Sequence, residues 1–420
     1  MMGTSLAHEP KTVRKQKFGG LLSNRQFLFL WIASIFTGLS FSIYLISETW
    51  FVLQALKSPS KLGIIMMLTT IPRVLLMSVG GVMADRLKRS HVIMITNSTR
   101  GLLVLGLALL ILNSSMNLYL LGVFALLFGV LDAFFWPANQ SMLPTLVKKE
   151  QIVRANSLVQ TTNQLSLLTG PVIAGFMIKF GSFFGVFVCT SVLLFCSSIL
   201  IGQIGYPDHP STDNKQKEPV FRQLKEGIVY VKTAPYLLLT MATSIFVNLL
   251  LVGPLNIGLP LMVDQHLKGD VLSLSYLESS LALGMVAGAF LTGILNIKRK
   301  RPIISLSLIA VLSFLNIFLS QMTALWHGII LLSLAGVCLS ISNIIAPSLV
   351  QEMTEKRMMG RVQSLMSTAS MGFIPLSFAL VSALLSSGLP IDMIILYSSI
   401  ALTVFVLTVL WRSKTIRTID

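Results

Sequence analysis

Long apolar runs alternate with short polar connections along almost the whole chain. A run of about 18 or more apolar residues is long enough for a helix to cross a bilayer. The pattern predicts twelve such helices, over residues 26–54, 62–84, 91–112, 118–146, 155–178, 183–205, 236–263, 275–296, 302–322, 325–350, 361–386 and 390–411. Proline and glycine inside these runs are compatible with spanning helices, because neighbouring helices can satisfy the freed backbone groups. The predicted fold class is an all-α membrane protein with twelve transmembrane helices.

Composition agrees with an integral membrane protein and excludes soluble classes. Hydrophobic residues make up 54% of the chain and charged residues 11%, less than half of the roughly 25% typical of soluble domains. The net charge of +16 comes from basic residues spread over many loops, which argues against a nucleic-acid partner. The three cysteines lie in apolar runs without metal-ligand spacing. We therefore expect no metal and no cofactor.

The distribution of Lys and Arg predicts the topology. If the N-terminus is inside, 26 basic residues lie in inner segments, 4 in outer segments, and 2 within spans. Inner loops of membrane proteins carry the excess of basic residues. We therefore expect a multi-pass protein of the cell (plasma) membrane with both termini cytoplasmic.

One long polar connection divides the chain. It covers residues 206–235 and separates a first half, 26–205, from a second half, 236–411, with predicted cytoplasmic tails at 1–25 and 412–420. Within it, residues 220–232 place apolar side chains on one helical stripe and charged side chains around the other faces. This pattern is typical of an amphipathic helix on the membrane surface, and a solvated linker helix is the alternative.

The two halves resemble each other at a constant offset of 207 residues. Arg154-x-x-Ser157-Leu158 recurs as Arg361-x-x-Ser364-Leu365, and Gly81 recurs as Gly288. Weak internal symmetry of this kind is found in duplicated transporter halves. It predicts two six-helix bundles around a central path.

The connection after the second span carries a recognisable motif. Gly81, Asp85, Arg86 and Arg89 match the pattern G-x-x-x-D-R-x-G-R-R/K, so the chain resembles the major facilitator superfamily. Lys88 replaces the inner glycine, and Ser90 replaces the last basic residue. The resemblance implies the major facilitator fold and a cytoplasmic gate made of this motif together with Arg361 of the second half. The alternative is a generic positive inner loop.

Two further segments resemble motifs found in exporters of this superfamily. The chain has Asp132 five residues before Pro137-Ala138, then Leu143-Pro144-x-Leu-Val and Ala155-Asn-Ser-Leu. These motifs are similar to those of the branch containing macrolide efflux proteins and enterobactin exporters. The fifth span has Gly170, Pro171 and Gly175, which resemble the G-P-x-x-G-G signature of drug antiporters, with Ala174 replacing one glycine. The glycines and the bend at Pro171 could control how tightly the halves close.

Ionisable residues inside spans are costly and mark candidate functional sites. Asp132 lies well within the fourth span, and its expected partner is Arg89 or Arg100. The pair is either a gate that breaks during transport or a structural ion pair. Glu48 lies in the outer part of the first span and Arg73 near the middle of the second, which together suggest a proton site. In the alternative, Glu48 only reaches the outer headgroups.

The remaining polar span residues are candidate lining or interhelical contacts. Tyr44, Gln164, Asn248 and Asn256 could line a substrate path or hydrogen-bond between helices. The chain has no ATP-binding P-loop and no metalloprotease or serine-hydrolase motif, so we expect no enzyme.

Together these features predict a monomeric secondary transporter that exports small amphipathic compounds, drug- or macrolide-like or siderophore-like, by proton antiport with alternating access. An importer on the same fold, or a membrane enzyme or scaffold, are the alternatives.

Overall fold

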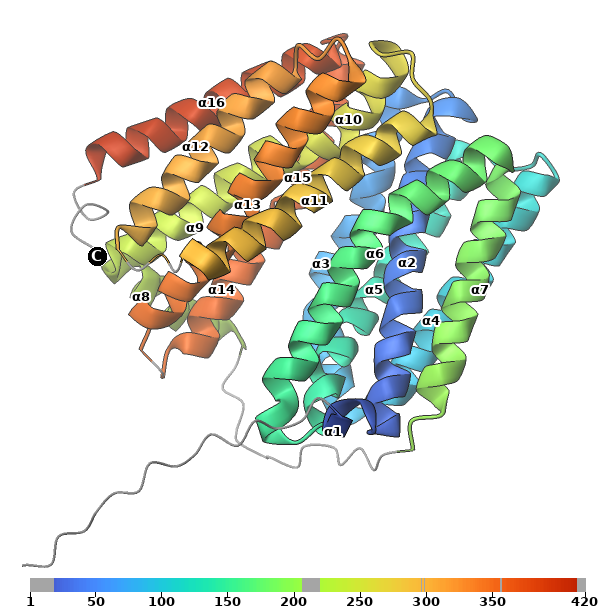
Figure 1. Ribbon diagram of the computed structural model, residues 1–420, viewed down its shortest axis with the longest axis horizontal. Coiled ribbons are helices and arrows are strands. Elements are labelled where there is room, and N and C mark those ends of the chain that lie inside the picture. Colours follow the sequence, from blue (N-terminus) through green and yellow to red (C-terminus); the bar gives the residue numbers. More distant parts are fainter. Residues whose placement is uncertain (1–18, 206–219, 296, 298, 356, 414–420) are drawn as a thin grey trace, which may run out of the picture.

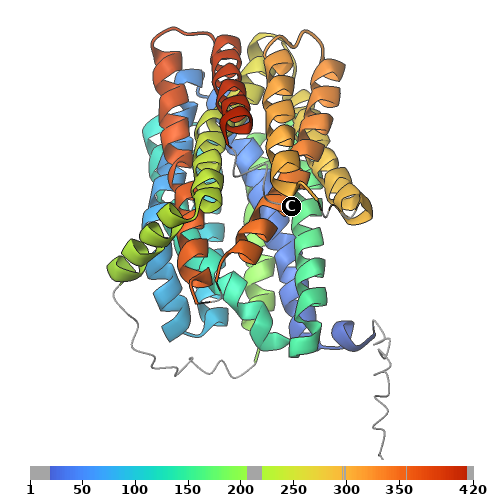
Figure 2. The ribbon, with the colours of Figure 1, turned by 90° about the vertical axis from the view of Figure 1, so that its left-hand side faces the viewer.

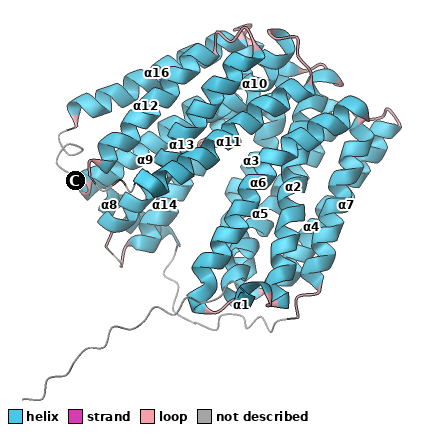
Figure 3. Cartoon of the chain, viewed as in Figure 1, coloured by secondary structure: helices cyan, strands magenta, loops and turns pink. Residues whose placement is uncertain are grey.

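The computed structural model describes residues 19–205, 220–295, 297, 299–355 and 357–413, and the elements within them are helical (Figures 1 and 3). After a short helix α1 (Gly19–Leu22), the first half packs six long helices: α2 (Arg25–Gln54), α3 (Leu62–Arg86), α4 (Arg89–Leu112), α5 (Leu118–Leu146), α6 (Ile152–Phe180) and α7 (Phe183–Gly202). Two 3₁₀ turns, Pro59–Lys61 and Lys149–Gln151, precede α3 and α6.

The second half repeats this arrangement with two interrupted helices. Its elements are α9 (Pro235–Val247) and α10 (Gly253–Gln265), joined by a π-helical turn at Asn248–Val252, then α11 (Val271–Leu295), α12 (Arg301–Leu319), α13 (Leu325–Met353), α14 (Met359–Gly372), α15 (Ile374–Ser386) and α16 (Ile391–Arg412). If α9 with α10, and α14 with α15, each count as one span, the described residues contain the twelve predicted spans. The predicted fold class is confirmed.

One predicted span is distinctly polar. Within the described residues, eleven helical segments are apolar and long enough to cross a membrane, and α6 is absent from that set. Its first half carries many amide and hydroxyl side chains, among them Gln160, Asn163 and Gln164. These three residues line a cavity described below. The polarity of α6 therefore reflects its position at that cavity.

The break between α9 and α10 is stabilised by a side chain from another helix. Pro254 has no backbone N–H and cannot continue the hydrogen-bond ladder of the helix. Ser377 of α15 accepts a hydrogen bond from the Gly253 N–H (2.8 Å) and donates one to the Leu249 carbonyl (2.6 Å). Neighbouring hydroxyl groups satisfy interrupted helices in membranes in this way.

The internal repeat is visible where helices cross most closely. A Cβ atom at Gly129 of α5 would lie 2.0 Å from the Thr69 carbonyl oxygen of α3. At the equivalent position of the second half, a Cβ atom at Gly336 of α13 would lie 2.3 Å from the Leu281 carbonyl oxygen of α11. Both close approaches require glycine, so these two positions, 207 residues apart, have the same packing role in each half.

The two halves converge at one end and diverge toward the end that carries α1 and α8 (Figure 1). In the view turned by 90°, the two halves overlap, and α1 and α8 again lie toward the same end (Figure 2). At the convergent end, Gln54 donates a hydrogen bond to Asp264 (2.5 Å), and Lys179 pairs with Asp270 (2.6 Å). Partial burial opposes ionisation of Asp270, but hydrogen bonds from Lys179 and Ser273 outweigh it and lower the pKa of this carboxyl group. These contacts join the first half to the second.

Apolar packing supports the same convergence. One buried cluster draws residues from both halves, including Trp50 and Leu62 from the first and Met262 and Phe378 from the second. At the other end, the buried clusters draw on one half each. The burial of apolar surface therefore favours contact between the halves at the convergent end.

The predicted amphipathic helix in the connection is present as α8 (Val220–Thr233). Val231 is buried in a cluster of the second half, and Glu226 forms an ion pair with Arg361 of α14. The Tyr230 hydroxyl accepts a hydrogen bond from the Glu355 N–H (3.2 Å). The described end of α8 thus packs on the second half, near the start of α14. Residues 206–219, the predicted flexible part, lie outside the described residues.

Candidate functional site

A cavity of about 260 Å³ lies within the first half. Five helices line it: α2, α4, α5, α6 and α7. Its lining combines aromatic rings, amides and hydroxyl groups with one ion pair. The lining residues include Thr37, Phe41, Arg100, Phe128, Asp132, Phe135, Trp136, Asn139, Gln160, Asn163, Gln164 and Ser197. We name it the N-half cavity.

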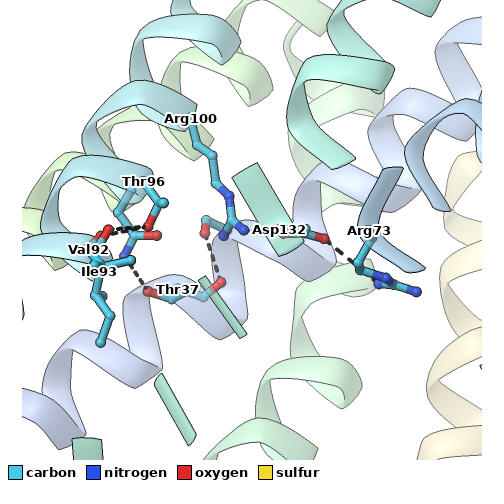
Figure 4. A network of polar contacts seen from close by, with 9 residues as sticks. Thr37, Arg73, Val92, Ile93, Thr96, Arg100 and Asp132 are labelled. Atoms are coloured by element: carbon cyan, nitrogen blue, oxygen red, sulfur yellow. Dashed lines mark hydrogen bonds and ion pairs between the residues drawn. The ribbon is translucent and has the colours of Figure 1, made fainter. Parts of the chain in front are cut away.

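Asp132 lies between two arginines from two other helices (Figure 4). Its Oδ1 atom accepts a hydrogen bond from Arg100 of α4, and its Oδ2 atom lies 3.8 Å from Arg73 of α3. The side chains of Asp132 and Arg100 are 1% and 2% exposed, whereas that of Arg73 is 24% exposed. The guanidinium of Arg100 also lies over the rings of Phe128 (5.1 Å) and Phe135 (4.5 Å), which favours the cation. The Asp132–Arg100 ion pair is therefore buried, and two aromatic rings contact its cation.

The sequence predicted either Arg89 or Arg100 as the partner of Asp132, and in the structure the partner is Arg100. Arg89 was the other candidate, but it begins α4 three turns before Arg100, at the end of the helix. The hydrogen-bond partner of Glu48 is Tyr44. Arg73 was expected to form a site with Glu48, but it lies beside Asp132. The reason is the close crossing of α3 and α5 at Gly80 and Gly129, which brings the second and fourth spans together.

The three charges do not cancel. Two guanidinium groups surround one carboxylate, so the cluster has a formal charge of +1 when all three are ionised. An uncompensated charge at this depth is costly and is stabilised by water or by a bound counter-charge. Arg73 is the more exposed of the two arginines and offers such a contact.

Glu48 is buried next to this cavity. Its carboxylate accepts a hydrogen bond from the Tyr44 hydroxyl (2.9 Å), and the residue is 4% exposed. The ring of Tyr44 stacks on Phe128 at 4.5 Å between centroids. The alternative in which Glu48 reaches the outer headgroups is therefore wrong, because the side chain packs inside the first bundle. Tyr44 is 1% exposed and packs there, and it does not line the N-half cavity.

The other three polar candidates occupy different places. Gln164 lines the N-half cavity. Asn248 lines a second cavity of about 330 Å³ within the second half, and we name it the C-half cavity. Asn256 lines neither cavity, and its amide donates a hydrogen bond to the Val252 carbonyl of its own helix.

A hydroxyl and amide network beside Arg100 did not figure among the predicted sites. Asn97 donates hydrogen bonds to Thr37 (3.2 Å) and Ser197 (3.1 Å), and these two hydroxyls lie 2.7 Å apart. Asn97 lies three residues before Arg100, hence on the same face of α4. That spacing is the signal that could have identified it.

The Gly-Pro segment of α6 contacts both halves. A Cβ atom at Gly170 would lie 2.4 Å from the Ser42 hydroxyl of α2, and one at Gly175 would lie 2.4 Å from the Ser275 hydroxyl of α11. Ser275 also donates a hydrogen bond to the Pro171 carbonyl (2.7 Å). The segment therefore lies at the seam between the halves, where its small residues permit close approach.

The motif that follows the second span lies at the divergent end. Asp85 belongs to the last turn of α3, but its side chain lies outside the described part of the chain. Arg86 is exposed and Arg89 is half-buried. A Cβ atom at Gly81 would meet nothing within 4 Å, whereas one at Gly80 would lie 2.0 Å from the Ala133 carbonyl oxygen. The close approach of the two helices is therefore at Gly80, one residue before the motif glycine.

Metal ligation finds no support in the described residues, among which no group of three or more His, Cys, Asp or Glu side chains could bind a metal ion.

Two repeated six-helix bundles, with a charged cavity at membrane depth, define a multi-pass membrane transporter. The family model of the Major Facilitator Superfamily matches residues 30–378. The chain belongs to this superfamily.

Relatives are similar to the chain in sequence, and solved structures are similar to it in fold. The chain is 27% identical over 297 residues to the enterobactin exporter EntS of Shigella flexneri, covering 68% of this chain and 67% of the relative. Its fold is similar to that of the nucleoside transporter NupG, with a TM-score of 0.70, 12% identity and coverage of 93% and 100%. A POT family transporter in complex with a thioalcohol-conjugated peptide gives a TM-score of 0.73, 13% identity and coverage of 93% and 96%. The structural neighbours support the fold.

Proposed function

We propose that the chain exports small amphipathic compounds, of drug-, macrolide- or siderophore-like kind, across the plasma membrane in exchange for protons. Both termini are cytoplasmic in this proposal, and the functional unit is a monomer. The observation that carries it is the charged N-half cavity, in which Arg100 and Asp132 lie at membrane depth beside aromatic and amide groups, with Arg73 next to Asp132. Charged groups at that depth mark substrate and ion pathways.

Alternating access is proposed from the packing of the halves. Polar contacts and a shared apolar cluster join them at one end, and the other end carries α1 and α8. With cytoplasmic termini, this conformation faces inward. Rocking of the two bundles about a central site would then expose the site to the other side.

The test is transport by the purified chain in lipid vesicles with an imposed pH gradient. Enterobactin and erythromycin serve as probes of the siderophore-like and macrolide-like classes. We expect at least one of them to move against its gradient, in the direction opposite to the protons. Movement of probe and protons in the same direction would establish the importer instead, and absence of proton-linked movement of either probe would refute the proposal.

The hypothesis that the motif after the second span forms a cytoplasmic gate gives a separate prediction. Asp85→Asn removes a negative charge that would face positive groups at the inner end when the halves close there. We expect export to be crippled while expression and membrane insertion stay intact. Lys88→Gln, three residues along at a position where the chain departs from the motif, should export at close to the parental rate. A correctly inserted Asp85→Asn protein with parental export would contradict the gate.

A further inference from the structure

An apolar groove of about 400 Å³ lies between α3 and α5, near the end of the molecule where both helices begin. It shares no lining residue with the N-half cavity or the C-half cavity. Its walls are open to the outside, since Ile64 of α3 is 42% exposed and Val123 of α5 is 56% exposed. The two halves are in contact at this end. The exposed apolar walls therefore face the bilayer and not a central path.

The groove depends on a glycine of α5. A Cβ atom at Gly122 would lie 3.1 Å from the Cδ1 atom of Leu68 on α3, so any larger residue would occupy part of the groove. At the 207-residue offset, Gly122 corresponds to Ile329. The side chain of Ile329 packs on the apolar cluster that the two halves share. The second half thus has a side chain at the position where the first half has the space of the groove.

One end of the groove is positively charged. Lys61 lines it, is exposed, and has no ion-pair partner among the described residues. The helix α3 starts there without a side-chain cap, so the positive end of its dipole lies beside this lysine. Tyr119, in the first turn of α5, lines the groove and is 84% exposed. Among the described residues that line the groove, none is acidic.

We propose that this groove binds one anionic phospholipid, with the phosphate at Lys61 and the start of α3 and an acyl chain in the groove. A lysine beside a helix N-terminus favours phosphate, and Lys and Tyr are common at the level of the lipid headgroups. From Lys61 to Leu68 the groove follows α3 for about 10 Å, roughly a third of the hydrocarbon core. The apolar walls select a lipid over a free anion, which would leave them uncovered.

The first test measures lipid binding to the purified chain in a neutral detergent by native mass spectrometry. Phosphatidylglycerol and phosphatidylcholine with the same acyl chains are compared. We expect one phosphatidylglycerol per chain to bind about fivefold more tightly than phosphatidylcholine, because only the first has a net negative charge for Lys61. Equal affinity for the two lipids would overturn the assignment of an anionic lipid.

Lys61→Gln tests the charged end of the groove. We expect the affinity for phosphatidylglycerol to fall about fivefold, to that for phosphatidylcholine. Lys268→Gln is the matched control, because Lys268 is the repeat counterpart of Lys61, is exposed, and does not line the groove. This control should keep the parental preference. A preference retained in Lys61→Gln would place the phosphate elsewhere and overturn the site.

Two tryptophan variants test the apolar walls. Leu126 and Leu127 of α5 are both 40% exposed, but only Leu126 lines the groove. We expect Leu126→Trp to weaken phosphatidylglycerol binding about tenfold, the effect of excluding about two methylene groups, and Leu127→Trp to bind as the parental chain does. Gly122→Ile introduces the residue of the second half and should act like Leu126→Trp. Parental binding by Leu126→Trp would overturn the groove as the site.

Thermal unfolding distinguishes a lipid from a free anion. A ligand that binds only the folded chain raises its Tm. We expect phosphatidylglycerol to raise the Tm of the parental chain and of Leu127→Trp, and to raise that of Lys61→Gln and Leu126→Trp less. Glycerol 1-phosphate carries the anion without acyl chains and should leave the parental Tm unchanged. A rise in Tm with glycerol 1-phosphate equal to that with phosphatidylglycerol would mean an anion site without a lipid, and would overturn the proposal.

Discussion

Replacing Asp132 with leucine is expected to lower the free energy of unfolding by about 3–5 kcal/mol and to stop transport. Arg100 is 2% exposed and would lose the carboxylate to which it donates a hydrogen bond. The contacts with Phe128 and Phe135 cannot replace a counter-charge at this depth. Denaturant unfolding in detergent micelles and transport in vesicles, on the same preparation, measure the two effects.

The double variant Asp132→Leu/Arg100→Met separates the two interpretations of the ion pair. It removes both charges, keeps the net charge of the cluster, and gives the N-half cavity the leucine that the C-half cavity has at position 339. Replacing a buried pair by apolar groups is often neutral or stabilising, so stability should return to near the parental value. Transport should remain lost if the pair takes part in it. Parental transport by the stable double variant would make the pair purely structural.

The fold could be predicted because each spanning helix requires a long apolar run. The predicted range 118–146 coincides with α5, and other boundaries differ by a few residues, as for 275–296 against Val271–Leu295. The interruption between α9 and α10 was not predicted as a break. Pro254 is visible in the sequence, but the hydroxyl of Ser377, which satisfies the freed backbone, comes from a helix more than 100 residues away.

The charged residues of the site were found from the sequence, but their pairing was only partly found. An intramembrane charge is conspicuous in any apolar run, so Glu48, Arg73, Arg100 and Asp132 all stood out. Their partners depend on which helices cross and at what depth. Arg73 lies beside Asp132 because α3 and α5 cross at this depth. No local sequence pattern in either span predicts this crossing.

The uncharged lining was the least predictable part. Asn343 and Gln363 are inconspicuous in the sequence, since single amides in membrane helices commonly contact other helices. Their exposure to the C-half cavity became evident only through the arrangement of the bundle. The internal repeat supplied a usable signal, because positions 207 residues apart from Gln160 and Asn163 line the second cavity.

Glu48→Gln is expected to abolish uphill export while retaining substrate binding and downhill exchange. An exporter without an ATP site must draw on an ion gradient, and one charge crossing the membrane exchanges about 2.3 kcal/mol per 100 mV. A proton needs a titratable carrier inside the bundle. Asp132 is bound by two arginines, and its protonation would leave both without a counter-charge. Glu48 has the neutral hydroxyl of Tyr44 as its hydrogen-bond partner, so it can gain or lose a proton without separating an ion pair.

The measurement is pH-gradient-driven transport in vesicles, with binding assayed on the same preparation. Glu48→Asp keeps a carboxyl group one methylene shorter and should keep partial coupling. Glu278→Gln makes the same acid-to-amide change eight residues into α11 of the other half, and we expect it to retain uphill transport. Loss of coupling in Glu278→Gln but not in Glu48→Gln would place the proton site in the second half. Full uphill transport by both variants would leave Asp132, or an ion other than the proton, as the coupling site.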